Sequence, residues 1–485
     1  MKNVKRYFLS FLAALSIVLL AFGAVKAFAQ DNAPGENDTY DVVLTKVKLS
    51  DLTGWPKQTG VNNEDYTGQK LNVTDYFGSG AKTLANVWFD VYKDTPTGTP
   101  VAGAATGADG TVTFTGLKAG KYYIVENKAK STLTSDEQLA NSAAVPVEIN
   151  LPVFKATGGW YTTGTDAVHV YPKNTVDKPS IDKVVSEDAK HDTALVGETK
   201  TFKVTSTMPE GIKDYKVLKF TDKFSAGLTY TGNLVVKNGG TVVNPSNYST
   251  TGTAAVGTKG AAISIAFNED YIKTLNPKDV ITITYDAVIN EEAVMGAANP
   301  NDVKLTYGTN PDSTKEVKPN ETPELHTGGA KFEKIDKATS AKLAGAKFVV
   351  TNEAGDKYLK QTAASGTTPA KNEWVANKAD ATVFTSAADG TFEVKGLPYG
   401  VKGNDNATGE TKYKLVEVEA PTGYALLQQP VEFTISSTTY TGRINQVNNN
   451  KVTIPQTGGI GSALVIAAGV LVVGLGFIAK RRSAK

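Results

Sequence analysis

The sequence predicts an all-β protein made of three β-sandwich domains that follow one another along the chain. Short runs that alternate apolar and polar residues recur between turn residues, as at 42–47, 111–114 and 280–285. Alternation with a period of two is typical of antiparallel strands that bury one face. Roughly 420 residues remain once both ends are set aside, enough for about three domains of ordinary size. Short helices, for instance at 135–141 and 268–274, are compatible with this class.

The first 29 residues have the pattern of an export signal. Basic residues precede an apolar stretch from Tyr7 to Val25, and Ala27-Phe28-Ala29 supplies the small-x-small pattern of a cleavage site. The alternative is an uncleaved membrane anchor, which would not need that site. We therefore expect residues 1–29 to be a signal peptide and the exported chain to begin near Gln30.

An internal repeat organises the residues between the two ends. Three segments occur twice in the same order: 84–91 with 343–350, 108–117 with 388–397, and 122–126 with 413–417. Each copy carries Asp-Gly, a tight-turn signal between strands. We therefore predict one kind of sandwich at 30–174 and again at 324–452, and a different sandwich at 175–323, which lacks these segments.

The chain closes with a short peptide, an apolar run and a basic tail, together residues 453–485. Ile454-Pro455-Gln456-Thr457-Gly458 precedes uncharged residues from Gly459 to Ala479, and Lys480-Arg481-Arg482 follows. At about 1.5 Å per residue this run spans the hydrocarbon core of a bilayer as one helix. The basic tail favours the cytoplasmic side. We expect transient membrane insertion that holds the pentapeptide just outside the membrane.

Composition argues against several function classes. The 51 basic and 49 acidic residues nearly balance, so no electrostatic footprint for nucleic acid is expected. Three histidines lie far apart in sequence and match no metal-ligand or triad spacing. We expect no metal, no cofactor and no turnover enzyme. Cysteine is absent, so an exported chain must gain mechanical resistance by other means than disulfides.

Three motifs carry a family resemblance. The pentapeptide resembles the LPxTG sorting signal of Gram-positive surface proteins, with Ile454 where Leu is usual. Residues 168–173 resemble the pilin motif WxxxVxVYPK, although Trp160 lies too far upstream for the usual spacing. Residues 413–424 match the pilin E-box YxLxExxAPxGY almost throughout. The chain thus resembles a backbone subunit of a sortase-assembled pilus, built of Cna-type immunoglobulin-like domains.

The resemblance implies how subunits are joined. Sortase would cut between Thr457 and Gly458 and pass the Thr457 acyl group to Lys173 of the next copy. Because Pro172 lacks an amide hydrogen, we expect the strand to end there and Lys173 to be exposed at a domain seam. The expected partners are sortase, other copies of the chain, peptidoglycan, minor pilins and host surface ligands.

The resemblance also implies a Lys–Asn isopeptide bond inside each domain. A buried amine and a buried carboxylic acid both become neutral, which suits amide exchange. The candidate sets of lysine, asparagine and catalytic acid are Lys334, Asn449 and Glu417 in the third domain, Lys183, Asn310 and Asp222 in the middle domain, and Lys46, Asn174 and Glu126 in the first. Asn448 and Asn450 are alternatives to Asn449. The first E-box is incomplete, which leaves that bond open.

Together these features predict a structural shaft subunit of a surface pilus that is attached to the cell wall. The alternative is a monomeric wall-anchored adhesin, or a minor pilin, of the same domain type. A monomeric adhesin would not need the VYPK segment that ends at Lys173.

Overall fold

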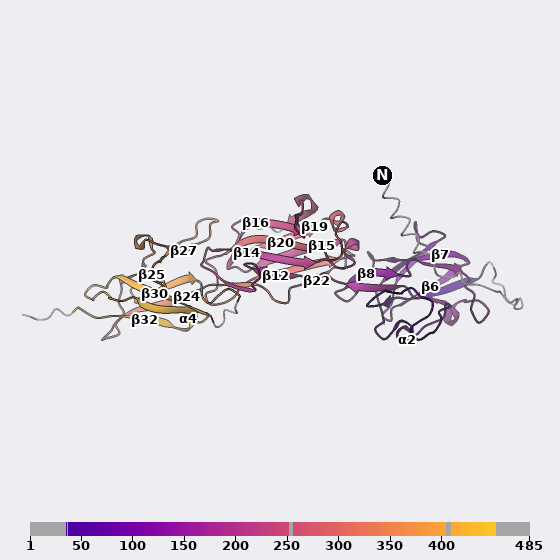
Figure 1. Ribbon diagram of the computed structural model, residues 1–485, viewed down its shortest axis with the longest axis horizontal. Helices are drawn as coiled ribbons and strands as arrows, with labels where there is room; N and C mark the ends of the chain where they lie inside the picture. Colours follow the sequence, from indigo (N-terminus) through magenta and orange to yellow (C-terminus); the bar gives the residue numbers. More distant parts are fainter. Residues whose placement is uncertain (1–34, 36, 252–255, 404–408, 453–485) are drawn as a thin grey trace, which may run out of the picture. The chain divides into compact units, whose positions relative to one another are not determined.

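The computed structural model describes residue 35 and residues 37–251, 256–403 and 409–452 (Figure 1). The predicted signal peptide, pentapeptide and C-terminal apolar run lie outside these residues. Within the described ranges, no helix is long and apolar enough to cross a membrane. Among the described residues strands dominate, and the helices α2, α3 and α4 have four or five residues each, which confirms the all-β prediction. The chain forms two compact units. The second unit contains residues 193–198, residues 293–298 and, among the described residues, those from His326 onward.

The first domain consists of three small sheets with strand orders β10-β1-β6, β3-β2-β11-β8 and β5-β4-β7-β9. Its elements are β1 Thr39–Thr45, β2 Val47–Lys48, α2 Val73–Phe77, β3 Lys82–Thr83, β4 Trp88–Lys93, β5 Ala102–Ala105, β6 Thr111–Lys118, β7 Gly120–Asn127, β8 Gln138–Ala143, β9 Val147–Leu151, η1 Gly164–Asp166, β10 Val168–Val170 and β11 Lys173–Asp177. The helix expected at 135–141 is wrong, because Gln138 onward pairs with β11 as a strand. The first two strands run parallel to the last two: β1 pairs with β10, and β2 pairs with β11, with Val47 beside Lys173.

The middle domain has two sheets, β12-β14-β20-β16-β17 and a larger one ordered β13-β23-β21-β15-β19-β18 with β22 on β21. Its elements are β12 Asp182–Val185, β13 His191–Thr193, β14 Thr199–Thr207, η2 Ile212–Asp214, β15 Val217–Phe224, β16 Leu228–Asn238, β17 Thr241–Val242, η3 Pro245–Asn247, β18 Tyr248–Thr251, β19 Ala262–Phe267, α3 Glu269–Ile272, β20 Val280–Ile289, β21 Asn299–Gly308, β22 Lys315–Val317 and β23 Glu324–His326. The helix expected near 268–274 is confirmed as α3.

The third domain pairs β29-β24-β32 in one sheet and β27-β26-β25-β30-β31, with β28 on β25, in the other. Its elements are β24 Gly328–Asp336, β25 Lys347–Asn352, β26 Tyr358–Thr362, β27 Lys371–Val375, η4 Lys378–Asp380, β28 Phe384–Thr385, β29 Thr391–Leu397, β30 Glu410–Glu419, β31 Val431–Ser436, α4 Thr439–Gly442 and β32 Ile444–Asn449. The first and last strands are again parallel neighbours, with Lys334 beside Val447.

The sequence repeat has a structural counterpart in strand register. Phe89 of β4 pairs with Glu126 of β7, and Phe348 of β25 pairs with Glu417 of β30 in the same antiparallel arrangement. In both domains the first strand also lies between one antiparallel and one parallel neighbour. The repeat therefore sets each acid opposite an equivalent buried phenylalanine.

Candidate functional site

The third domain holds a buried lysine, acid and amide that come from three strands. Lys334 of β24 contacts Asn449 Oδ1 through its Nζ, which also lies 3.1 Å from Glu417 Oε1. Asn449 Nδ2 donates to Glu417 Oε1 at 3.0 Å and to Oε2 at 2.9 Å. All three side chains are buried, whereas Asn448 and Asn450 are exposed. Among the three asparagines considered, strand alternation turns only Asn449 toward Lys334.

The groups around this site position the Glu417 carboxyl group and lower the pKa of the Lys334 amine. The backbone N–H of Leu427 donates to Glu417 Oε2 at 2.8 Å, and Asn449 Nδ2 also donates to the carbonyl of Ala425 at 3.0 Å. Burial lowers the pKa of Lys334, and the neighbouring Glu417 only partly opposes this. A lysine with a lowered pKa supplies the neutral amine that nucleophilic attack on an amide requires.

The first domain contains the same arrangement. Lys46 Nζ contacts Glu126 Oε2 and Asn174 Oδ1, and Asn174 Nδ2 donates to Glu126 Oε1 at 2.9 Å. The Lys46 and Asn174 side chains are fully buried. Burial lowers the pKa of Lys46. The incomplete E-box after Glu126 therefore does not prevent the three side chains from meeting.

The middle domain differs in its acid and in its neighbours. Lys183 Nζ lies 2.7 Å from Asp222 Oδ2, and both residues are buried. Burial lowers the pKa of Lys183 to about 8 and raises the pKa of Asp222, so both groups shift toward their neutral forms. The Tyr285 hydroxyl donates to Asp222 Oδ2 at 2.7 Å, and Asn301 Nδ2 donates to that hydroxyl at 2.8 Å.

The structure corrects the expected asparagine of the middle domain. Asn310 lies beyond the end of β21, and its Oδ1 accepts the backbone N–H of Asp312 at 2.9 Å. Asp222 pairs with Val303, seven residues earlier, so at about 3.4 Å per residue Asn310 lies roughly 20 Å or more along the chain from the acid. Asn301 takes that place, because it lies two residues before Val303 on the inward face.

The sequence around Asn301 does contain a signal for this position. Alternate residues of β21 are buried, namely Asn299, Asn301, Val303, Leu305 and Tyr307. An asparagine on the same face as a run of apolar residues is a candidate for a buried polar site. Tyr285 gave no comparable signal, because its strand β20 belongs to the other sheet of the domain.

Lys173 is buried, which corrects the expectation of an exposed lysine at the end of a strand. Pro172 separates β10 from β11, and Lys173 opens β11 with 5% of its surface exposed. Its Nζ donates to the carbonyl of Tyr171 at 2.6 Å and lies 5.0 Å from the Phe77 ring and 5.6 Å from the Trp55 ring. Burial, with a smaller effect of Lys46, lowers the pKa of Lys173 to about 7.

Lys173 is covered by residues 49–81, the segment between β2 and β3. Its apolar side chains form a small cluster with Tyr171. The hydroxyl of Tyr171 accepts the backbone N–H of Leu71 at 2.6 Å, and Phe77 of α2 packs on the Tyr171 ring at 5.7 Å. Thr457 and Gly458, the other half of the expected linkage, lie outside the described residues.

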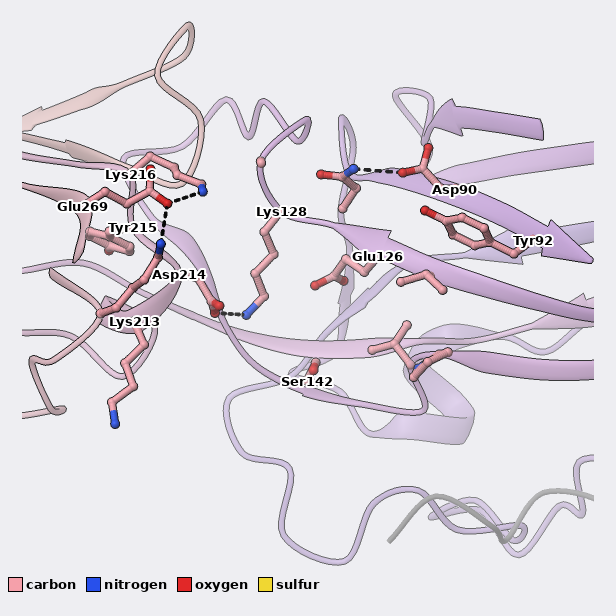
Figure 2. A pocket seen from close by; sticks show the side chains of 16 residues that line it. Asp90, Tyr92, Glu126, Lys128, Ser142, Lys213, Asp214, Tyr215, Lys216 and Glu269 are labelled. Atoms are coloured by element: carbon pink, nitrogen blue, oxygen red, sulfur yellow. Dashed lines mark hydrogen bonds and ion pairs between the residues drawn. The ribbon is translucent and has the colours of Figure 1, made fainter. Parts of the chain in front are cut away.

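A hollow of about 500 Å³ opens beside the first-domain site, lined partly by β7 and partly by residues of the middle domain (Figure 2). Lys128 Nζ lies 2.6 Å from Asp214 Oδ2 across it, and Lys216 Nζ lies 2.5 Å from Glu269 Oε1. Asn127 Nδ2 donates to Asp90 Oδ2 at 2.8 Å. Of these three pairs, Lys128–Asp214 joins the two domains and the other two lie within one domain each, so the hollow is lined by polar groups that already have partners, and we assign it no ligand.

Three family models match parts of the chain. They are a Gram-positive pilin subunit D1 N-terminal domain over residues 94–175, a prealbumin-like fold domain over 328–450 and an LPXTG cell wall anchor motif over 446–484. The first match ends just past Lys173 and Asn174. The second contains the complete Lys334, Glu417 and Asn449 site.

Whole-chain comparisons agree with these matches. The chain is 26% identical to the fimbrial subunit type 1 of Actinomyces viscosus, over 96% of each chain. It is 24% identical to the trypsin-resistant surface T6 protein of Streptococcus pyogenes, over 58% of this chain and 53% of that one. The full-length RrgB pilus protein of Streptococcus pneumoniae superposes with a TM-score of 0.67 at 20% identity, over 87% of this chain and all of the other. At this identity the structural likeness establishes the fold.

Proposed function

Because this chain belongs to the Gram-positive pilins that carry an LPXTG-type cell wall anchor, we propose that its copies are joined into a shaft through Thr457 of one and Lys173 of the next. The chain is a structural component of a wall-anchored surface pilus and not an enzyme. The observation that carries the linkage is the environment of Lys173. Burial lowers the pKa of Lys173 to about 7, so a substantial fraction of this lysine is a neutral amine near neutral pH, the form that attacks an acyl-enzyme.

The linkage is tested directly on purified pili. Tryptic digestion and tandem mass spectrometry should yield a branched peptide in which the Thr457 carboxyl group is joined to the Lys173 amine. Polymers linked through any other lysine would contradict the assignment, and pili without covalent branching would contradict the shaft model altogether.

The cover over Lys173 predicts restricted access to the amine. Trp55→Ala removes one of the two rings beside Nζ, so labelling of Lys173 by an amine-reactive ester at pH 8.5 should rise severalfold, as measured by peptide mapping. Trp160→Ala is a matched control, because Trp160 packs on Phe154 at 5.0 Å. Equal labelling of Lys173 in the Trp55→Ala variant and the unaltered chain would show that Trp55 does not limit access.

We also propose that each domain closes by an internal isopeptide bond, at Lys46–Asn174, Lys183–Asn301 and Lys334–Asn449. In each case the neutral amine attacks Cγ of the asparagine, and ammonia leaves. In the first and third domains the support is a buried lysine that contacts both the acid and the asparagine. In the middle domain it is a buried lysine that contacts the acid, with Tyr285 linking that acid to Asn301. The acids Glu126, Asp222 and Glu417 act as the catalysts.

Such bonds suit a fibre that lacks disulfides. In the first and third domains the crosslinked residues lie on or beside the parallel terminal strands, so pulling force passes from one end strand to the other through a covalent bond. The chain-entropy treatment of disulfides gives about 4.7 kcal/mol for closing a loop of about 100 residues. The loops here are of that order, with 128 and 115 positions between the linked residues of the first and third domains.

Intact mass tests the number and the partners of the bonds. Each condensation removes one ammonia, about 17 Da, so the chain of residues 30–452 should be lighter than its sequence by three such losses. Asn301→Ala should show two losses, and Asn310→Ala should retain all three. A mass with no loss would remove the internal bonds from the proposal, and the reverse pattern of the two variants would restore Asn310 as the partner.

A further inference from the structure

The middle-domain site contains a hydroxyl that the other two sites lack. In the first and third domains the glutamate itself accepts a hydrogen bond from the asparagine Nδ2, at 2.9 Å for Asn174 and at 2.9–3.0 Å for Asn449. In the middle domain the acid is an aspartate, one methylene shorter. There Asn301 Nδ2 donates instead to the hydroxyl of Tyr285, which donates to Asp222.

The three contacts form a continuous line between the atoms that exchange a proton. When Lys183 and Asn301 condense, the Nζ–Cγ bond forms and the Cγ–Nδ2 bond breaks. Nζ must lose one proton and Nδ2 must gain one to leave as ammonia. Nζ lies 2.7 Å from Asp222 Oδ2, Oδ2 lies 2.7 Å from the Tyr285 hydroxyl, and that hydroxyl lies 2.8 Å from Nδ2.

We propose that Tyr285 is a catalytic residue of the middle domain, which passes to the departing Asn301 nitrogen a proton that Asp222 replaces from Lys183. The proposal rests on the proposed isopeptide bond of this domain. The relay leaves Tyr285 and Asp222 as they began, and no other reactant is consumed. The phenol and the aspartate together do what one glutamate does in the other two domains.

The surroundings of Tyr285 favour this role over solvent-mediated transfer. Its side chain is buried, and the rings of Phe202, Phe224 and Tyr230 pack around it with centroids 5.4–6.2 Å away. Burial beside Asp222 also raises the pKa of Tyr285 well above its usual value, so the phenol keeps its proton until the amide nitrogen leaves. Asp222 Oδ1 and Asn301 Oδ1 are buried without a hydrogen-bond partner among the described residues, so the amide oxygen and one of the two carboxyl oxygens are unsatisfied before the reaction.

The proposal is tested by measuring how fast the Lys183–Asn301 bond forms. Residues 30–452 are produced by cell-free synthesis, samples are stopped in hot denaturant, and the Lys183–Asn301 peptide pair is quantified by mass spectrometry. Tyr285→Phe should slow this bond by roughly 10²-fold or more, the usual contribution of a positioned proton donor. The Lys46–Asn174 and Lys334–Asn449 bonds of the same molecules should form at the unaltered rate. Tyr215→Phe is the matched control, another buried tyrosine of this domain.

A second variant separates proton transfer from packing. Asp222→Glu combined with Tyr285→Phe restores the longer acid found in the other domains, so bond formation should recover although residue 285 remains phenylalanine. The proposal is overturned if Tyr285→Phe reacts at the unaltered rate, or if the double variant is as slow as Tyr285→Phe. Absence of the Lys183–Asn301 pair from the unaltered chain would instead overturn the isopeptide bond itself, and the role of Tyr285 with it.

Discussion

Replacing Lys173 by alanine is expected to abolish the high-mass ladder of covalent polymers in cell-wall extracts, while monomer still reaches the wall. The substitution removes the amine that accepts the Thr457 acyl group and leaves the C-terminal sorting signal intact. The change is all-or-none, because no second amine in the first domain is expected to occupy the same position. Immunoblotting of wall extracts with an antibody to the chain measures it.

Two further variants test whether a loss of the ladder reflects a folding defect rather than the missing amine. Lys173→Met keeps most of the side-chain volume beneath Trp55 and Phe77, so it should also lose the ladder without opening a cavity. Lys178→Ala changes a surface lysine of the same region, paired with Asp136 at 2.5 Å, and should keep the ladder. A ladder that persists in Lys173→Met would show that another lysine is the acceptor.

Glu417→Ala is expected to leave the third domain without its Lys334–Asn449 bond. Glu417 contacts both reacting side chains, so its removal takes away the acid that polarises the amide. The domain should still fold, because burial lowers the pKa of Lys334 and lets its amine become neutral once the acid is gone. It should melt at a lower temperature, since a crosslink over a loop of this length is worth about 4–5 kcal/mol. Compared with the mass of its own sequence, the variant should show one ammonia loss fewer than the unaltered chain does.

The controls separate catalysis from scaffolding. Glu417→Gln keeps the side-chain size and a hydrogen-bonding head but cannot act as an acid, so the bond should again be missing. Glu419→Ala removes an exposed carboxylate of the same strand, paired with Lys347 at 2.8 Å, and should keep the bond.

Leu415→Ala opens a cavity costing roughly 2–5 kcal/mol and should lower the stability of the third domain with the bond intact. The bonds of the other domains should be unaffected, because distant sites behave independently. A retained Lys334–Asn449 linkage in Glu417→Gln would make Glu417 a structural residue.

The sequence alone determined the fold class and the three residues that meet in the buried sites of the first and third domains. Alternation with a period of two predicted the strands, and the repeat predicted that Glu126 and Glu417 occupy equivalent places, as their pairing with Phe89 and Phe348 bears out. Alternation within β32 also selected Asn449 over its two neighbours. These inferences depend on patterns within one strand or between copies of one segment, where sequence spacing fixes which side of a strand a residue faces.

Only the tertiary structure decided what depends on contacts between distant segments. Asn301 and Asn310 lie nine positions apart, and the choice between them follows from the register of β21 against β15, which sequence spacing does not contain. Tyr285 reaches Asp222 from the opposite sheet. The burial of Lys173 comes from residues 49–81, about a hundred positions earlier, which fold over the start of β11 because their apolar side chains pack against Tyr171. Packing across such separations, rather than local pattern, sets the pKa of each lysine and the partner it meets.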